Sequence, residues 1–445
     1  MLMMEVVLED HSAKVSLKTT LNMEFFSLVM SFVEESAKAY GLGKNETIKL
    51  RLACEEIFVY LSESDHKDKS VIIEAENGVY FVGIKFLFDA RNFDPHAFNL
   101  TARTSFDTEA DLKEMGLIIA SRSVDKLNML NDLKEGPGIE LIKEKFYPEF
   151  TEHIIVSPGP VYDYDIFPLE GEAVKFFVYN VLSYYPQSLI PQGFSYPGKV
   201  VDMIASNKYR ALVASDKKGN IAGGILWRSA GTKMVEMFGP YTFAQPAENN
   251  MADELVNGLL TSIARTDAVL LVDLLPTPEL PKGYFEFLGS LDYFPEKGDH
   301  LTWQFYYRHL REDTGMKVWS HPDLIPFLNK EYKRLAFARN ILKTGYDGEA
   351  CPAHSLFSAR FDRILKIVSL SLMRDGKDAA DIIDSHIKIF KAEGINNIIF
   401  RIDLAYPWQA NLVPVLTKIK FVPRFVLPHA GTGDMVIFQY IEGEV

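Results

Sequence analysis

We single out three side chains as candidates for proton transfer: Glu56, Glu236 and Tyr284. A carboxylate can accept a proton from a reacting group and a phenol can donate one, so these residues are candidates for general base and general acid. Glu56 and Tyr60 are four residues apart, a spacing that places both side chains on one face of a helix. For Glu236 the competing interpretation is a solvated strand residue without a chemical role.

Other kinds of site find little support in the sequence. The two cysteines, Cys54 and Cys351, are far apart, which excludes a disulfide framework and a cysteine-rich metal site. The ten histidines are scattered and no pair has zinc-protease spacing, so we expect no metal. The segment Gly41–Lys44 is not a phosphate loop, because Lys38 stands at its first glycine position and Asn45 replaces the hydroxyl residue.

Length and charge bound the class of protein. A chain of 445 residues suggests about three domains, and an apolar fraction of 47% is ample for their cores. The net charge of −13 argues against a nucleic-acid or membrane-surface binder. No apolar run reaches the ~18 residues of a membrane span, and the N-terminus lacks a secretion signal. We therefore expect a cytoplasmic protein.

The middle of the chain supplies the elements that would position Glu236. Apolar runs, a turn signal at 216–220 and helical periodicity predict a strand hairpin, a third strand, a loop, a helix, a buried strand and a last helix that carries Tyr284. In chain order these elements span 211–215, 221–227, 234–238, 241–250, 251–264, 268–274 and 284–289.

This order of elements resembles the GNAT N-acetyltransferase superfamily. The resemblance implies that the loop before the helix cradles the pyrophosphate of acetyl-CoA on backbone N–H groups, which requires close backbone approach and a helix N-terminus. The corresponding residues are Ala247, Asn249, Asn250, Met251 and Ala252. Asn250 stands at the first glycine of the family pattern, and Ala252 conforms to it. Acetyl transfer would then use Glu236 as the base for the amine and Tyr284 as the acid for the thiolate.

The first 148 residues predict helices and strands in a second recognisable order. The expected helices span 22–40, 46–61 and 110–124, and the expected strands 5–9, 14–19, 70–76, 79–88, 124–130 and 139–145. This order resembles the anti-sigma-factor branch of the GHKL (histidine-kinase-type) ATPases. The residues that carry the resemblance are Leu52–Tyr60, Asp89–Pro95 and Met115–Ile118.

The GHKL resemblance implies a nucleotide pocket built from Glu56, Tyr60, Asp89 and Gly116. Glu56 would prepare a water for attack on the γ-phosphate, and Asp89 would reach the adenine-binding position after a one-residue slip. Tyr60 stands where the family has its Mg²⁺-binding asparagine, and a phenol is a poor Mg²⁺ ligand. A nucleotide-free fold that serves as a protein-interaction surface is therefore favoured over an ATP–Mg²⁺ site.

The last third predicts a second GNAT-like half, without a glycine-rich loop before the helix expected at 379–392. The whole sequence thus predicts an α/β (α+β) fold: a GHKL-type α/β sandwich in 1–150 and two GNAT-like mixed-sheet domains in 158–310 and 316–445. We expect a bacterial regulatory or sensory protein that acts through protein contacts, with a sigma factor or an anti-anti-sigma-like regulator as the implied kind of partner. Two alternatives stay open: an N-acetyltransferase that uses acetyl-CoA in the middle domain, and an anti-sigma-factor serine kinase.

Overall fold

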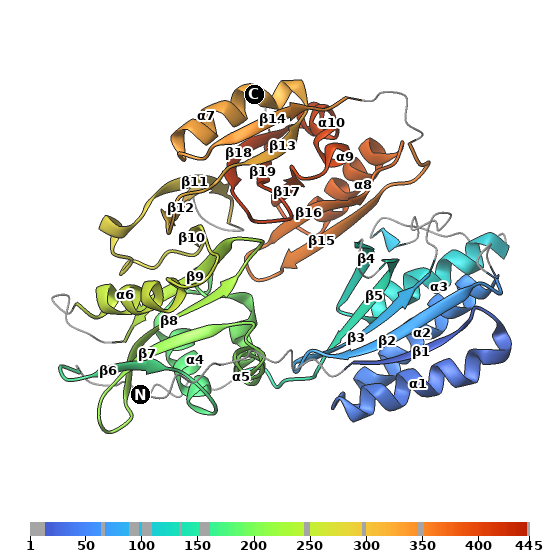
Figure 1. The fold of residues 1–445 in the computed structure, drawn as a ribbon, viewed down its shortest axis with the longest axis horizontal. Helices are drawn as coiled ribbons and strands as arrows, with labels where there is room; N and C mark the ends of the chain where they lie inside the picture. Colours follow the sequence, from blue (N-terminus) through green and yellow to red (C-terminus); the bar gives the residue numbers. More distant parts are fainter. Residues whose placement is uncertain are drawn as a thin grey trace. The chain divides into compact units, whose positions relative to one another are not determined.

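The chain divides into two compact units in the computed structural model (Figure 1). Unit 1 comprises residues 1–98 and 102–148, and unit 2 comprises residues 99–101 and 149–445. The residues described are 14–63, 67–88, 98–99, 109–132, 136–150, 161–243, 250–295, 300–345 and 351–442. The strand expected at 5–9 lies outside them. No helix in these ranges is long and apolar enough to cross a membrane.

Unit 1 packs three helices on one antiparallel sheet. The helices are α1 (Phe26–Ala39), α2 (Lys44–Glu63) and α3 (Glu109–Ser123). The strands are β1 (Lys14–Thr20), β2 (Ser70–Asn77), β3 (Phe81–Leu87), β4 (Lys126–Asp132) and β5 (Gly136–Glu144), in the order β1-β2-β3-β5-β4. Alternate residues of β2 (Val71, Ile73 and Ala75) are buried, as expected for a sheet with one covered face. The predicted helices and hairpins of this region are confirmed.

Unit 2 begins with a mixed sheet of seven strands. They are β6 (Asp165–Pro168), β7 (Arg210–Ser215), β8 (Ile221–Ser229), β9 (Met234–Thr242), β10 (Leu270–Asp273), β11 (Glu286–Tyr293) and β12 (Leu301–His309). Their order is β11-β12-β10-β9-β8-β7-β6. In this sheet β9 and β10 are the parallel pair, and α6 (Met251–Ile263) makes the crossover that such a pair requires.

Helices cover both faces of this sheet. A side chain on Gly223 of β8 would meet Met251 of α6, and one on Gly224 would meet Phe177 of α4 (Ala173–Tyr184). Adjacent residues of a strand point to opposite faces, so α4 and α6 lie on opposite sides. A second short helix, α5 (Pro197–Ala205), packs against α4.

The rest of unit 2 repeats part of this plan. The strands of its five-stranded sheet are β15 (Leu356–Asp362), β16 (Ile367–Arg374), β17 (Asn397–Asp403), β18 (Phe421–Leu427) and β19 (Met435–Tyr440), in the order β15-β16-β17-β19-β18. Here β16 and β17 are the parallel pair and α8 (Ala379–Ala392) is the crossover. A parallel pair, β13 (Met316–Ser320) with β14 (Arg339–Lys343), and the helices α7 (Ile325–Arg334), α9 (Pro407–Ala410) and α10 (Val413–Lys418) complete the unit.

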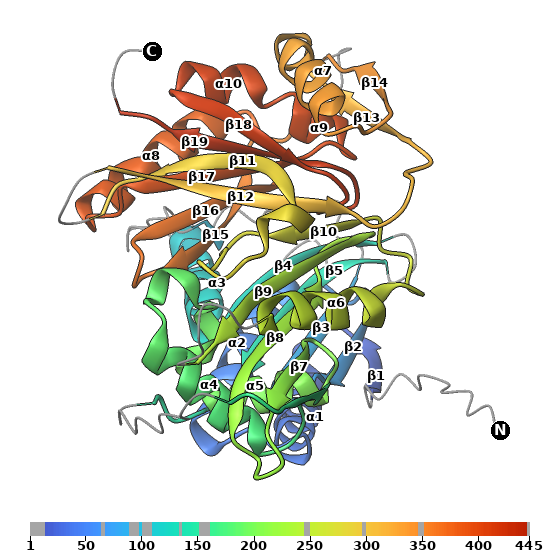
Figure 2. The same ribbon diagram turned by 90° about the vertical axis from the view of Figure 1, so that its left-hand side faces the viewer.

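The two sheets of unit 2 share one hydrophobic core, and β11 runs alongside β18 (Figure 2). Side-chain amides of the second sheet bind the backbone of β11 and its end. Gln439 of β19 accepts from the Asp292 amide at 3.0 Å and donates to the Asp292 carbonyl. Asn397 of β17 accepts from the Phe294 amide at 2.8 Å and donates to its carbonyl at 3.0 Å.

Two local predictions in unit 2 are wrong. The helix expected to carry Tyr284 is a single 3₁₀ turn, η6 (Lys282–Tyr284), followed by strand β11. Strand β9 does not end at Phe238, as predicted, but continues to Thr242. In both places pairing with the neighbouring strand decides the local structure: β11 pairs with β12, and the last residues of β9 pair with Gly223 and Gly224 of β8.

Candidate functional site

One candidate site in the structure is the place where β9 and β10 separate. The two strands pair over four residues, from Met234 opposite Leu270 to Met237 opposite Asp273. Beyond Met237, β9 continues for five residues to Thr242, whereas β10 ends at Asp273. The last residues of β9 therefore lack β10 as a backbone partner, which is the place where an extended ligand could add to the sheet.

Side chains of the protein itself occupy this edge of β9. The Tyr185 hydroxyl accepts a hydrogen bond from the Thr242 amide at 2.7 Å and donates one to the Thr242 carbonyl at 3.1 Å. The Thr277 hydroxyl donates to the Pro240 carbonyl at 2.7 Å. Burial is the main cause that raises the pKa of Tyr185, which favours the protonated phenol needed for donation. The backbone groups that an amide-containing ligand would use at these positions are thus already satisfied.

The ring of Tyr241 fills the space behind the same edge. This side chain is fully buried, and its hydroxyl donates to the Leu189 carbonyl at 2.9 Å. Its ring centroid lies 4.9 Å from that of Tyr185, 6.2 Å from that of Phe177 and 6.5 Å from that of Phe194. These aromatic contacts hold Tyr185 in position against β9.

The start of α6 is acidic. Asn250 is the N-cap residue and its side chain makes no capping hydrogen bond, while Asp253 and Glu254 lie in the first turn. Carboxylates interact favourably with the positive end of a helix and would repel a pyrophosphate placed there. Met251 is buried and Ala252 is half-buried, both on the first turn. The predicted loop residues Ala247 and Asn249 lie outside the described residues.

The two acyl-transfer candidates face different surroundings. Glu236 is 7% exposed, and its Oε2 lies 2.8 Å from Nε and 2.6 Å from Nη2 of Arg228, its cross-strand neighbour. The carboxylate of Glu236 is thus engaged in an ion pair. Tyr284 instead contacts α6: its hydroxyl accepts from the Asn257 amide at 3.2 Å. The Arg308 guanidinium lies 5.4 Å from its ring centroid. Glu236 and Tyr284 thus bind different partners.

Asp273 is a candidate that sequence reasoning missed. Its side chain is fully buried at the end of β10, with Oδ1 accepting from the Leu275 amide at 3.0 Å and Oδ2 without a partner in the described part of the chain. Burial raises the pKa of Asp273 well above its usual value; the Leu275 amide opposes this shift and Glu236 adds to it. An acidic residue that ends an apolar run, 268–272, was the available signal.

A cavity of about 520 Å³ follows Asp273 along the chain. It is lined by Ser188, Leu189, Leu274, Leu275, Pro276, Thr277, Pro278, Leu280, Lys282, Thr302, Trp303, Gln304, Phe305 and Tyr306. Its walls are mostly apolar, as in many small-molecule sites. Asp273 itself is fully buried and is not among the residues that line this cavity.

In unit 1 the structure brings two of the predicted pocket residues together. A Cβ atom on Gly116 of α3 would lie 2.4 Å from Glu56 Oε2 of α2, so the carboxylate touches the facing helix. This contact leaves no room for a phosphate between the two positions. Burial is the main cause that raises the pKa of Glu56, and the neighbouring Glu55 adds to it. Tyr60 is half-buried on the same helix, and Asp89 lies outside the described residues.

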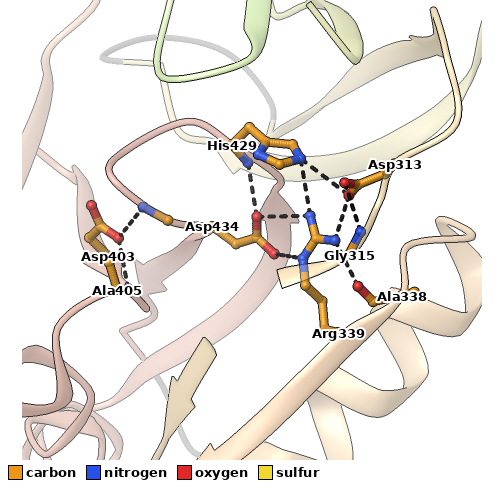
Figure 3. A network of polar contacts seen from close by, with 9 residues as sticks. Asp313, Gly315, Ala338, Arg339, Asp403, Ala405, His429 and Asp434 are labelled. Carbon is orange, nitrogen blue, oxygen red and sulfur yellow. Dashed lines mark hydrogen bonds and ion pairs between the residues drawn. The ribbon is translucent and has the colours of Figure 1, made fainter. Parts of the chain in front are cut away.

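A buried polar network joins the segment before β13, the start of β14 and the loop between β18 and β19 (Figure 3). The Arg339 side chain is fully buried, with Nε 2.5 Å from Asp434 Oδ2 and Nη1 2.5 Å from Asp313 Oδ2. The His429 ring nitrogen Nε2 lies 3.3 Å from Arg339 Nη2 and 3.2 Å from Asp313 Oδ2. Arg339 contacts each of the other three side chains, so we assign the network to stability. Among the described residues, no cluster of His, Cys, Asp or Glu could hold a metal ion.

Comparison with known proteins gives weak structural likeness. No family model and no curated protein sequence matches the chain. A GNAT phosphinothricin acetyltransferase from Sinorhizobium meliloti, solved with AcCoA, is 16% identical over 34% of this chain and 90% of its own, with a TM-score of 0.26. A GNAT acetyltransferase from Staphylococcus aureus Mu50 is 13% identical over 33% and 100%, with a TM-score of 0.25. An N-acetyltransferase from the same organism is 12% identical over 34% and 99%, with a TM-score of 0.26.

Likeness at these TM-scores carries no argument about activity. The structure itself shows a mixed sheet in which α6 joins the parallel pair β9 and β10. The fold is α+β, as predicted.

Proposed function

We propose that the chain is a regulatory or sensory protein that acts mainly through protein contacts and that its GNAT-like region has lost the ordinary use of acetyl-CoA. The observation that carries this proposal is the closed edge of β9, where Tyr185 and Thr277 hold the backbone groups of Thr242 and Pro240. The acidic first turn of α6 adds support, because it disfavours a pyrophosphate.

In this proposal unit 1 is an anti-sigma-type domain that works without nucleotide. The contact between Glu56 and Gly116 and the tyrosine at position 60 support this part. Large apolar side chains are exposed on η1 (Met23–Phe25), α1 and α2, as expected of a surface that meets a protein partner: Met23, Phe25, Leu28, Ile48 and Leu52. A sigma factor or an anti-anti-sigma-like regulator is the kind of partner we propose.

An active N-acetyltransferase is the second candidate. One observation favours it: the cavity of about 520 Å³, whose mostly apolar walls are typical of small-molecule sites. In that case acetyl-CoA would have to displace Tyr185 from β9 to reach the backbone of Thr242. The serine-kinase alternative rests on Glu56 alone.

Thermal unfolding of the full chain with acetyl-CoA, and separately with ATP–Mg²⁺, tests the proposal. A ligand that binds only the folded state stabilises it by about 2.7 kcal/mol at 100 times its Kd. We expect neither ligand to raise the melting temperature. A rise with acetyl-CoA that Ala252→Trp removes and Ser262→Trp, at the far end of α6, retains would establish the acetyltransferase candidate instead. A rise with ATP–Mg²⁺ that Glu56→Ala removes and the neighbouring Glu55→Ala retains would establish a nucleotide site.

A further inference from the structure

A second cavity, of about 600 Å³, lies between the two sheets of unit 2. One wall comes from the seven-stranded sheet and includes Arg228 and Glu236, and the other comes from β15 to β19. The volume is that of a site for a small organic molecule.

The cavity is basic although the chain is acidic. Its lining includes four basic side chains, Lys208, Arg228, Arg360 and Arg401, and two acidic ones, Glu236 and Asp292. That is an excess of two positive charges in a chain with a net charge of −13. The acidic groups are also engaged: Glu236 by Arg228 at 2.6 Å, and Asp292 by Arg424 at 2.7 Å.

Two guanidinium groups remain for a ligand. Within the described ranges, those of Arg360 and Arg401 have neither a hydrogen bond nor an ion pair. Strand register places them on one face of the second sheet: Arg360 is opposite Ser369, and Arg401 is opposite Ser371, two residues further along β16. The Ser369 hydroxyl is itself buried and without a hydrogen-bond partner. The guanidinium groups can only donate hydrogen bonds, and the serine hydroxyl can donate one as well, so this face is rich in donors.

Electrostatics make Arg401 the centre of this set. Burial lowers the pKa of Arg401, the nearby Arg360 and Arg228 act in the same direction, and Glu236 opposes them. Arginine nevertheless stays charged in proteins. A partly buried cation near two other cations, whose acidic neighbour Glu236 is already paired with Arg228, is unfavourable until an anion joins it.

The walls around these donors are fixed and partly aromatic. The amides of Asn397 and Gln439, both on the lining, bind the backbone of β11 and its end. Tyr293 and Trp303 stack with ring centroids 4.3 Å apart, and Phe305 packs against Phe425 at 5.3 Å. The cavity therefore offers an anion-binding face opposite an apolar face.

We propose that this cavity binds a small organic anion whose carboxylate or phosphate group is held by Arg401, Arg360 and the Ser369 hydroxyl. The apolar body of the anion lies against Trp303 and Phe305. This site goes beyond the proposed regulatory function and stands whether or not acetyl-CoA binds the chain.

Phenyl phosphate is the probe for the test, with phenol as its neutral counterpart and benzoate as its carboxylate counterpart. Binding to the full chain is followed at constant ionic strength by tryptophan fluorescence, since Trp303 lines the cavity. We expect saturable binding of phenyl phosphate or benzoate at millimolar concentrations, and weaker binding of phenol. The stronger of the two anions identifies the head group.

Arg401→Gln should weaken anion binding by about tenfold to a hundredfold, the usual effect of losing a hydrogen bond to a charged group. Arg363→Gln is the matched control, because the Arg363 side chain is 73% exposed and pairs with Glu393. Without ligand, Arg401→Gln should keep or raise the melting temperature, since it removes an unpaired cation. No saturable binding of either anion to the unmodified chain would overturn the proposal. Equal binding to Arg401→Gln, or a clear loss of its stability without ligand, would do so as well.

Discussion

Replacing Arg339 by methionine should destabilise unit 2 strongly. The substitution would leave Asp313 and Asp434, whose side chains are 4% and 0% exposed, without their arginine. Removing one partner of a buried ion pair typically costs about 3–5 kcal/mol, because the remaining charge stays buried and uncompensated. That is a large share of the roughly 5–15 kcal/mol by which a folded domain is stable.

The loss of stability in Arg339→Met should depend on pH. In the unmodified chain burial alone would raise the pKa of Asp313, but Arg339 and then His429 bring it below its usual value. This contribution to stability is therefore full above the unfolded pKa of about 3.9 and is lost as the pH falls through the lower folded pKa. In Arg339→Met burial dominates, so the folded state of the variant takes up protons that the unfolded state does not. The stability difference should then be largest near pH 7 and shrink toward about pH 5.

Urea unfolding followed by tryptophan fluorescence measures this difference. All four tryptophans lie in unit 2, so the signal reports that unit alone. The exposed Arg363→Met is the control and should unfold like the unmodified chain. A loss of less than about 1 kcal/mol in Arg339→Met, or a loss that does not change between the two pH values, would refute the reasoning.

Two further substitutions test contacts within unit 2. Tyr185→Phe removes the hydroxyl that binds both the amide and the carbonyl of Thr242 in β9, and should lower the free energy of unfolding by about 1–3 kcal/mol in the same assay. The side chain of Tyr162 is 81% exposed, so Tyr162→Phe is the control and should leave stability unchanged. Equal stability of the two variants would contradict the closed edge. Gly231→Ala would place Cβ 2.0 Å from the His429 carbonyl oxygen, whereas Gly171→Ala, also at positive φ, meets nothing within 4 Å. The first should therefore lower stability by about 1–3 kcal/mol more than the second, and equal losses would show that the loop yields freely.

Elements with a strong local pattern were predictable. The helix expected at 379–392 coincides with α8, whose buried residues Ile383, Ile387 and Phe390 follow helical spacing. Strand β11 was not predictable in this way, because its partner β12 begins eight residues after its end and its other neighbour, β18, more than a hundred residues later. Gly289 of β11 lies against Phe425 of β18, a long-range contact that a sequence window does not contain.

The candidate sites also differ in how far the sequence could predict them. Glu56 and Gly116 were placed together by a family resemblance, and the structure has them in contact. The closed edge of β9 could not be foreseen, since Tyr185 reaches it from a segment 57 residues away. The anion-binding face did leave a signal: Arg401 interrupts an apolar strand, 398–402, where a charge is costly unless something pairs with it.

The second sheet closes its diverging strands in the same manner as the first, which strengthens the case against a cofactor in either half. Pairing of β16 with β17 ends at Ser371 opposite Arg401, and both strands continue. The Gln409 side chain then bridges them, donating to the Leu372 carbonyl at 3.2 Å and accepting from the Asp403 amide at 2.8 Å. In each half, therefore, a protein side chain satisfies backbone groups where the parallel pair opens. Because an unsatisfied buried backbone group is costly, such closure is what a sheet requires once no ligand supplies these hydrogen bonds.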